Sequence, residues 1–265
     1  MIPAVASSAE LEVRLRRATW ALAAREMRRV LSLWTQTLLP PLITGLIFLA
    51  IFGGALAGRL HTVAGVPYVR FILPGLLVMT VASQAFANAS TSLFQAKNEG
   101  YIEDILTSPL RPRQIVIAYM AGGLLRGWLS ALALALITLP FTGAPHDLLL
   151  LLAALILCGL VFGALGVITG VWADTFDQHA FIANLIISPL ALLGGVFYAA
   201  QRLHEPWRSI TRIDPLYYLV DATRQGWAGI HETSPPAALL VALGITAALY
   251  ATAVALVQSG WRLKP

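Results

Sequence analysis

Charged residues and nucleotide- or metal-binding motifs are scarce in this sequence. The only two lysines among its 265 residues are Lys97 and Lys264, and neither follows a glycine-rich loop, so the G-x-x-x-x-G-K-[ST] pattern of a P-loop is absent. The five histidines are scattered, and no H-E-x-x-H, Cys/His cluster or G-x-S-x-G occurs. His179 has no second ligand at metal spacing. We therefore expect no catalytic residue, metal site or cofactor in this chain.

The composition also argues against a soluble protein. Only 12% of the residues are charged, whereas 58% are hydrophobic and the mean hydropathy is +0.75, so a soluble domain would leave much apolar surface in water. The single cysteine, Cys158, lies in an apolar run and cannot form a disulfide within the chain. The net charge of +5 comes from basic residues beside apolar runs, where anionic lipid explains them better than nucleic acid does.

Six stretches are apolar over the roughly 20 residues that a membrane-spanning helix needs. They predict an all-α polytopic membrane protein whose residues 36–265 form one domain of six transmembrane helices. The predicted spans are 38–57, 71–94, 115–139, 148–172, 180–199 and 237–257.

Residues 1–35 predict an amphipathic helix lying at the membrane interface. Val13, Trp20, Met27 and Trp34 recur every seven residues on one side, and arginines gather on the other. The residues expected at the interface are Arg14, Arg17, Trp20, Arg25, Arg28 and Trp34. The alternative is an amphipathic helix that packs on other protein.

The loop 97–113 is a compact, charged segment between two apolar spans. Ile102, Ile105 and Leu106 are spaced i, i+3 and i+4, which predicts a short helix with one apolar side and acidic residues elsewhere. Pro109 and Pro112 end that helix. We expect the loop to take force from a partner, with the three apolar residues as its docking face.

Polar residues interrupt the second and third spans. Thr80, Gln84, Asn88, Thr91 and Gln95 fall in a narrow arc of one helix, so they are expected to face other helices or a water-accessible path. A charge at the depth of Arg126 costs roughly 2.5 to 3.5 kcal/mol, so Arg126 is expected to face the protein interior, as a functional charge or in a buried structural pair.

Glycines in the third and fourth spans predict close helix packing. The positions are Gly122, Gly123, Gly127, Gly159, Gly163, Gly166 and Gly170.

Residues 201–234 are half apolar and half charged and predict two short helices broken at Asp214-Pro215, half-inserted on the outer side as a re-entrant hairpin between the fifth and sixth spans. Orientation follows from charge. With both termini cytoplasmic, about eleven Lys and Arg lie inside and about six outside, which satisfies the positive-inside rule. The loop 97–113 is then cytoplasmic as well.

In their order and spacing, several segments resemble one family over nearly the whole chain. They are QTLLPPLITGLIFLAIFG, FILPGLL, EDILTSPLRPRQIVIAY, the Gly122-Gly123 and Arg126-Gly127 pairs, and GGVFY. The family is the membrane permease of type-2 ATP-binding-cassette (ABC-2) exporters, the group that includes O-antigen, nodulation-factor and drug export permeases.

The resemblance implies a dimer of six-helix chains, with a homodimer expected, and two separate ABC ATPase subunits that bind ATP and Mg²⁺ on the cytoplasmic side of the inner membrane. It makes residues 1–35 the connecting helix and the loop 97–113 the carrier of the coupling helix. The coupling residues are Tyr101, Ile102, Glu103, Asp104, Ile105 and Leu106. In the outer hairpin the family usually has Asn before Pro, where this chain has Asp214, which can also cap a helix.

The expected function is therefore a permease subunit that exports an amphipathic or glycosylated substrate or drug and is not itself an enzyme. The residues expected to line its path or dimer seam are Thr80, Gln84, Asn88, Thr91 and Arg126. Two alternatives are open at this point. One is a secondary transporter or channel, and the other is a membrane assembly factor that transports nothing.

Overall fold

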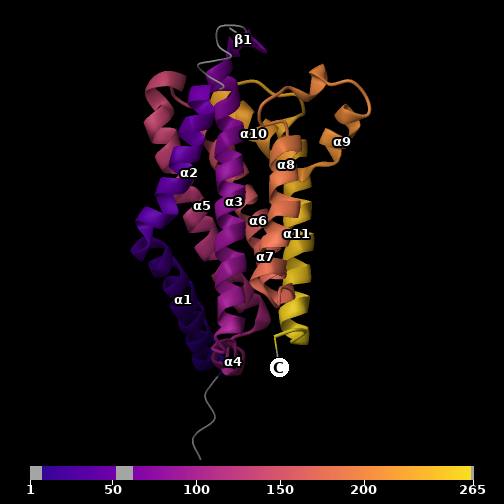
Figure 1. Cartoon of the computed structure of the whole chain (residues 1–265). Helices are drawn as coiled ribbons and strands as arrows, with labels where there is room; N and C mark the ends of the chain where they lie inside the picture. The colour runs from indigo at the N-terminus through magenta and orange to yellow at the C-terminus, as the bar shows by residue number, and fades with distance from the viewer. Residues whose placement is uncertain (1–7, 52–61, 264–265) are drawn as a thin grey trace, which may run out of the picture.

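Apolar helices set the architecture of the protein (Figure 1). The computed structural model describes residues 8–51 and 62–263. Within these ranges five helices are long and apolar enough to cross a membrane, which confirms an all-α polytopic membrane protein apart from a small β1–β2 hairpin (Thr62–Val63, Val66–Pro67). The five are α2 (Trp34–Phe48, with helical turns to Ile51), α3 (Tyr68–Asn98), α5 (Pro112–Thr142), α6 (Leu148–Trp172) and α11 (Pro235–Ser259). Residues 52–57 of the first predicted span lie outside the described residues.

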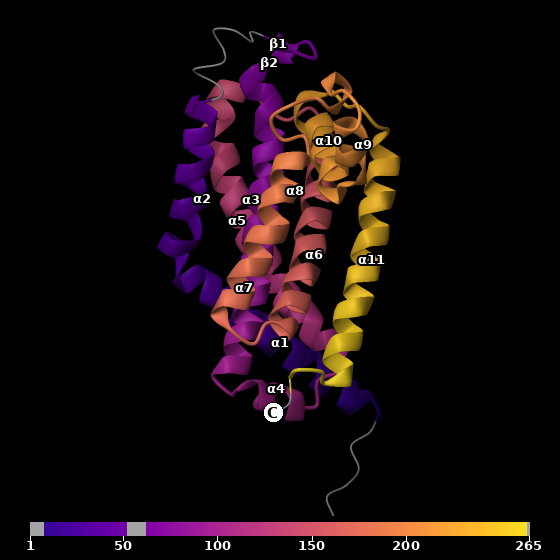
Figure 2. The same cartoon turned by 45° about the vertical axis from the view of Figure 1, so that its right-hand side comes forward.

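The fifth predicted span, 180–199, is a helical segment with a π-helical turn inside it. It folds as α7 (Phe176–Ile182), a π-helical turn (Ala183–Ile187) and α8 (Ser188–Leu193), which follow one another in front of α6 in Figure 2. The π-helical turn lies just before Pro189, which cannot donate a backbone hydrogen bond. The predicted end at residue 199 is wrong, because the helix stops at Leu193 and Gly195 turns the chain with a φ of +73°. A sixth continuous span is therefore not confirmed.

The core of the bundle is built around α3, which packs against α5, α6 and α10. Its side chains Ile72, Leu76 and Ala85 are fully buried. The glycine predictions for α5 and α6 are confirmed at the closest contacts: a Cβ at Gly123 would lie 2.6 Å from the Ala85 carbonyl oxygen of α3. On the other side of α3, a Cβ at Gly166 would lie 2.7 Å from the Phe86 carbonyl oxygen.

The helical hairpin of residues 201–234 lies at the other end of the bundle from α4 (Figure 1). It contains α9 (Trp207–Ile213) and α10 (Pro215–Ala228), so the predicted break at Asp214-Pro215 is confirmed. Its α10 is anchored in the bundle, where Leu216 and Val220 are buried and the helix packs on α3, α6 and α11. Insertion of the hairpin into a membrane stays a prediction.

The helices α1 (Ser8–Ser32) and α4 (Ile102–Thr107) lie at the end of the bundle where the chain also finishes (Figure 1). From that end α1 runs obliquely up the side of the bundle and leads into α2. Its inner face, which includes Leu22, Ala23 and Val30, is buried, whereas Trp20 and, at the start of α2, Trp34 are exposed. The helix α1 thus packs on the rest of the chain along one face and keeps a second face, which carries Trp20, exposed.

Candidate functional site

The short helix α4 turns its apolar side toward its own chain. Ile102 is 3% exposed and Ile105 is 7% exposed, and both belong to a buried cluster with Ile115 and Val116 at the start of α5. The expected docking face at Ile102, Ile105 and Leu106 is therefore wrong for the two isoleucines, and Leu106 is only half-exposed. Periodicity showed that one side of α4 is apolar, but it could not show that the rest of the bundle covers that side.

What α4 presents outward is acidic. Glu103, Asp104 and Thr107 are exposed, and the two carboxylates occupy the first turn of the helix, where negative charge is favoured. The helix is held from both ends. Gly100 turns the chain after α3 with a φ of +82°, and α5 begins with Pro112 directly after Arg111, whose backbone N–H donates to Gln114 Oε1 at 2.8 Å. This outer side of α4, Glu103, Asp104 and Thr107, is called the acidic face below.

A buried carboxylate joins α1 to α3. Glu26 is 2% exposed, Ser92 Oγ donates to its Oε2 at 2.5 Å, and Arg25 Nη2 lies 2.9 Å from its Oε1. Arg29 Nη2 lies 3.4 Å from Oε2. At Gly122 of α5 a Cβ would lie 2.8 Å from Glu26 Cβ, so α1 also touches α5 at this point. The burial of Glu26 was not predicted from the sequence. It could have been inferred from the position of Glu26, which is four residues from both Leu22 and Val30 on the apolar side of an arginine-rich helix.

Arg29 connects the same place to the polar stripe of α3. Its Nη2 donates to Asn88 Oδ1 at 3.1 Å, and its Nη1 donates to Gln95 Oε1 at 3.3 Å. The helix α1 therefore contacts the half of the stripe that lies nearest α4. We call Arg25, Glu26, Arg29, Asn88 and Ser92 the α1–α3 junction.

The remaining predicted path residues lie beyond the junction. Thr80 is buried, whereas Gln84 and Thr91 are half-exposed. Arg126 is half-exposed, and its Nε has no hydrogen-bond partner among the described residues, as is also true of Gln84 Oε1. No acidic partner of Arg126 is found within the described ranges.

The junction also reaches the loop 97–113. The guanidinium carbon of Arg25 lies 5.4 Å from the centre of the Tyr101 ring, in cation–π range. Lys97 Nζ is 2.9 Å from Asp174 Oδ1, and Arg262 Nη1 is 3.0 Å from Asp174 Oδ2, so α3, the end of α6 and the chain terminus meet there. The Lys97 ammonium holds the pKa of Asp174 below its ordinary value.

The predicted interface residues lie on the outer surface of α1 and, for Trp34, at the start of α2. Those that the structure leaves exposed are Arg14, Arg17, Trp20, Arg25, Arg28 and Trp34. Arg16, which interrupts the arginine pattern of the sequence, lines a small cavity with Arg111 and Gln114. At the start of α7, His179 Nε2 lies 2.9 Å from Ser90 Oγ, and its ring contacts Phe86 and Phe94, so it packs against the face of α3 that α1 leaves free.

The hairpin contains a second buried charge that the sequence analysis missed. Arg224 of α10 is fully buried, its Nη2 donates to the Gly195 carbonyl at 2.7 Å, and its guanidinium lies 4.0 Å from the centre of the Phe71 ring. Tyr68 Oη donates to the Phe197 carbonyl at 3.0 Å. These contacts fix the GGVFY turn against α3 and α10.

The expected helix cap at Asp214 is confirmed, since its Oδ1 accepts from Leu216 N at 2.8 Å. Burial raises the pKa of Asp214 to about 7. An unfolded aspartate ionises near pH 4, so between about pH 4 and about 7 the folded chain binds the extra proton and its stability falls as pH rises. In Asp214→Asn the cap is kept and the titration is removed. We expect the melting temperature of the purified wild type to fall between pH 5 and pH 8, and that of Asp214→Asn to fall less. Equal slopes would contradict the burial of this carboxyl.

The comparisons with known proteins agree with this geometry. The model of the ABC-2 type transporter family matches residues 17–227, which include most of α1, the junction, α4 and all but the last residue of α10. The chain is 32% identical over 242 residues to the inner membrane transport permease YadH of Escherichia coli strain K12, covering 91% of this chain and 94% of that protein. It is 25% identical to nodulation protein J of Neorhizobium galegae, covering 73% of this chain and 74% of that protein. The chain therefore belongs to the ABC-2 type transporter family and is a transport permease.

Proposed function

We propose that this permease is the membrane subunit of an inner-membrane exporter, driven by two ABC ATPase subunits that bind ATP and Mg²⁺ on the α4 side. The observation that carries the proposal is the acidic face of α4, which is exposed at the end where α1 and the chain terminus also lie. Because the isoleucines beneath it are buried in the core of the bundle, a push on α4 acts directly on that core. The name of YadH, an inner membrane transport permease, supports the placement in the inner membrane. The substrate that we propose is amphipathic or glycosylated, or a drug, as the family resemblance implies.

In this proposal both termini and α4 are cytoplasmic, and α7 and α8 together supply the sixth span. Two copies of the chain form the transporter. Gln84 and Thr91, which are half-exposed, line the path or the seam between copies, together with Thr80 and Arg126. Asn88 has a double role, because it also belongs to the α1–α3 junction.

Movement has two routes out of α4. The first runs through Pro109 and Pro112 into α5, since prolines make the link stiff. The second runs from Tyr101 to Arg25 and on through Glu26 to α3. Both routes end at helices that carry the proposed path residues, so closure of the ATPases would move α3 and α5 together between an inward-facing and an outward-facing packing.

Reversing the charge of the acidic face is expected to break the contact with the ATPase. We expect the double change Glu103→Lys with Asp104→Lys to lower co-purification of an ABC ATPase, co-expressed from the neighbouring reading frame, at least tenfold, because like charges at an interface repel. Both side chains are exposed, so the permease itself should keep its melting temperature.

The matched control is Asp177→Lys, an exposed acidic residue of α7 outside the loop 97–113. It should leave co-purification intact. Undiminished ATPase in the double variant would remove α4 as the docking element. Substrate movement by the purified permease alone, in vesicles without ATPase, would instead favour a secondary transporter or channel.

A further inference from the structure

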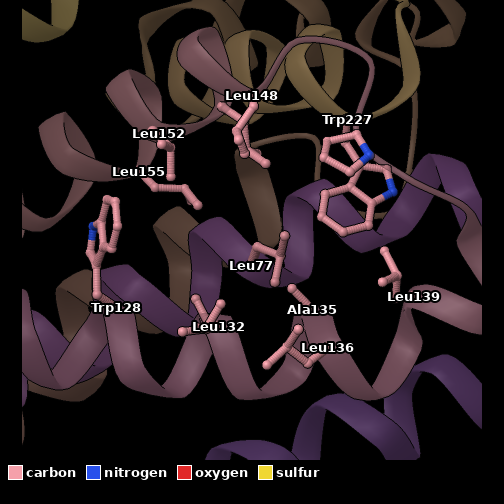
Figure 3. A pocket seen from close by; sticks show the side chains of 13 residues that line it. Leu77, Trp128, Leu132, Ala135, Leu136, Leu139, Leu148, Leu152, Leu155 and Trp227 are labelled. Carbon is pink, nitrogen blue, oxygen red and sulfur yellow. The ribbon is translucent and has the colours of Figure 1, made fainter.

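An apolar pocket of about 260 Å³ lies between α5 and α6, away from the α1–α3 junction (Figure 3). Its two long walls are rows of leucines spaced i, i+4 and i+7, which run side by side along the two helices. The rows are Leu132, Leu136 and Leu139 of α5, and Leu148, Leu152 and Leu155 of α6. Leu77 of α3 lies at the back, and every lining side chain is apolar or a tryptophan. We call this space the α5–α6 pocket.

The mouth of the pocket opens on the outside of the bundle. Leu136 at its rim is 60% exposed, and Leu132 and Leu148 are also more than half-exposed. They belong to two helices that are long and apolar enough to cross a membrane, so the medium at the mouth is lipid hydrocarbon. A groove along the helix axes matches the direction of acyl chains in that medium.

The pocket is closed at its two ends by tryptophans, Trp128 of α5 and Trp227 of α10 (Figure 3). Trp227 is 2% exposed and is held from behind. The backbone N–H of His146 donates to its carbonyl oxygen at 3.2 Å, and a Cβ at Gly226 would lie 2.7 Å from the backbone of Leu151. The pocket is thus preformed. Both indole N–H groups are buried and have no hydrogen-bond partner within the described ranges, so the two rings close the pocket as apolar walls.

Small side chains make the space. Ala131 and Ala135 lie one turn apart on α5, between the two tryptophans, and both line the pocket. A leucine at Ala135 would fill most of the gap with atoms of the chain itself. The pocket therefore exists because small side chains occupy one side of a groove lined by leucines. Its shape fits one narrow apolar chain.

We propose that the α5–α6 pocket binds an acyl chain of a membrane phospholipid and so attaches the α10 hairpin to the bilayer. The acyl chain lies between the leucine rows, with the rings of Trp128 and Trp227 as the walls at its two ends. The site requires the membrane spans and is independent of the transport cycle proposed above.

The test uses the full chain in vesicles of phosphatidylcholine whose acyl chains carry bromine, which quenches tryptophan fluorescence on contact. The share of Trp227 is the difference between the wild type and Trp227→Phe. We expect more than half of the Trp227 fluorescence to be quenched in the wild type. When Ala135→Leu is added to the wild type and to Trp227→Phe, we expect the quenching of Trp227 to be at least twofold less. Ala247→Leu adds the same bulk on an exposed position of α11 and should change nothing.

Leu136→Phe narrows the mouth at an exposed position without touching the core, and should also lower the quenching, which keeps the test decisive if Ala135→Leu does not fold. Equal quenching of Trp227 with and without the added bulk overturns the proposal, as does an unquenched Trp227 in the wild type. Efficient cross-linking of Leu136→Cys to a second copy overturns it as well, because the mouth is then covered by protein.

Discussion

Gly123→Leu is expected to force α3 and α5 apart and to lower the free energy of unfolding by about 3 kcal/mol or more, at the upper end of overpacking effects. Even a Cβ at Gly123 would lie 2.6 Å from the Ala85 carbonyl oxygen and 3.3 Å from its carbon. Those atoms are backbone of a fully buried helix turn, so they cannot move aside as the end of a side chain could. One turn on, a Cβ at Gly127 would lie 3.0 Å from the Val81 carbonyl oxygen, so the whole contact is close.

The measurement is the melting temperature of the purified chain in detergent, beside the matched control Gly244→Leu. Gly244 is also in an apolar helix, α11, but a Cβ there would meet no atom within 4 Å among the described residues. Leucine in place of glycine favours a helix by up to about 1 kcal/mol, so the control should melt at the same temperature or higher. If both variants melt alike, α3 and α5 are not in backbone contact at Gly123.

The close contacts at these glycines could be predicted from the sequence, because small residues in an apolar helix have few other uses. The helices themselves could be predicted for the same reason: hydropathy is a local property, and it gave α3, α5, α6 and α11 close to their observed bounds. The cap at Asp214 is local as well, since proline at the next position fixes the start of α10.

What could not be predicted depends on contacts between distant parts of the chain. The buried side of α4 is covered by the rest of the bundle, and nothing in the spacing of Ile102 and Ile105 distinguishes the chain's own core from an ATPase cleft. The fifth predicted span contains a π-helical turn, which hydropathy does not detect. The partner of Glu26 on α3 lies 66 residues away.

Contacts with distant parts of the chain also decide what could be predicted for α1. Its arginines indicate a helix at a charged surface, and most of them are indeed exposed. Glu26 differs because two arginines and one serine together make its burial tolerable, and only the folded chain brings Ser92 to it. An isolated buried carboxylate would be costly, so the charge of Glu26 identifies the place where α1 is fixed to the bundle.

Glu26→Ala is accordingly expected to release α1 and to destabilise the chain by about 3 to 5 kcal/mol, the usual loss when one partner of a buried ion pair is removed. The alanine would leave Ser92 Oγ without its 2.5 Å acceptor and would leave Arg29, which is partly buried, with only amide and carbonyl oxygens of α3. Glu12→Ala is the control, because Glu12 is an exposed acidic residue on the same helix. It should change the melting temperature little.

A double-mutant cycle separates the lost pair from the stranded charge. Glu26→Ala combined with Arg29→Ala removes both, so the double variant should be more stable than the sum of the two single losses, by about 1 to 3 kcal/mol. Additive losses would show that Glu26 and Arg29 are not energetically coupled, although Nη2 lies 3.4 Å from Oε2. A positive coupling that persists in the ATPase-bound transporter, and is altered when ATP is added, would place this pair on the route by which α4 moves α3.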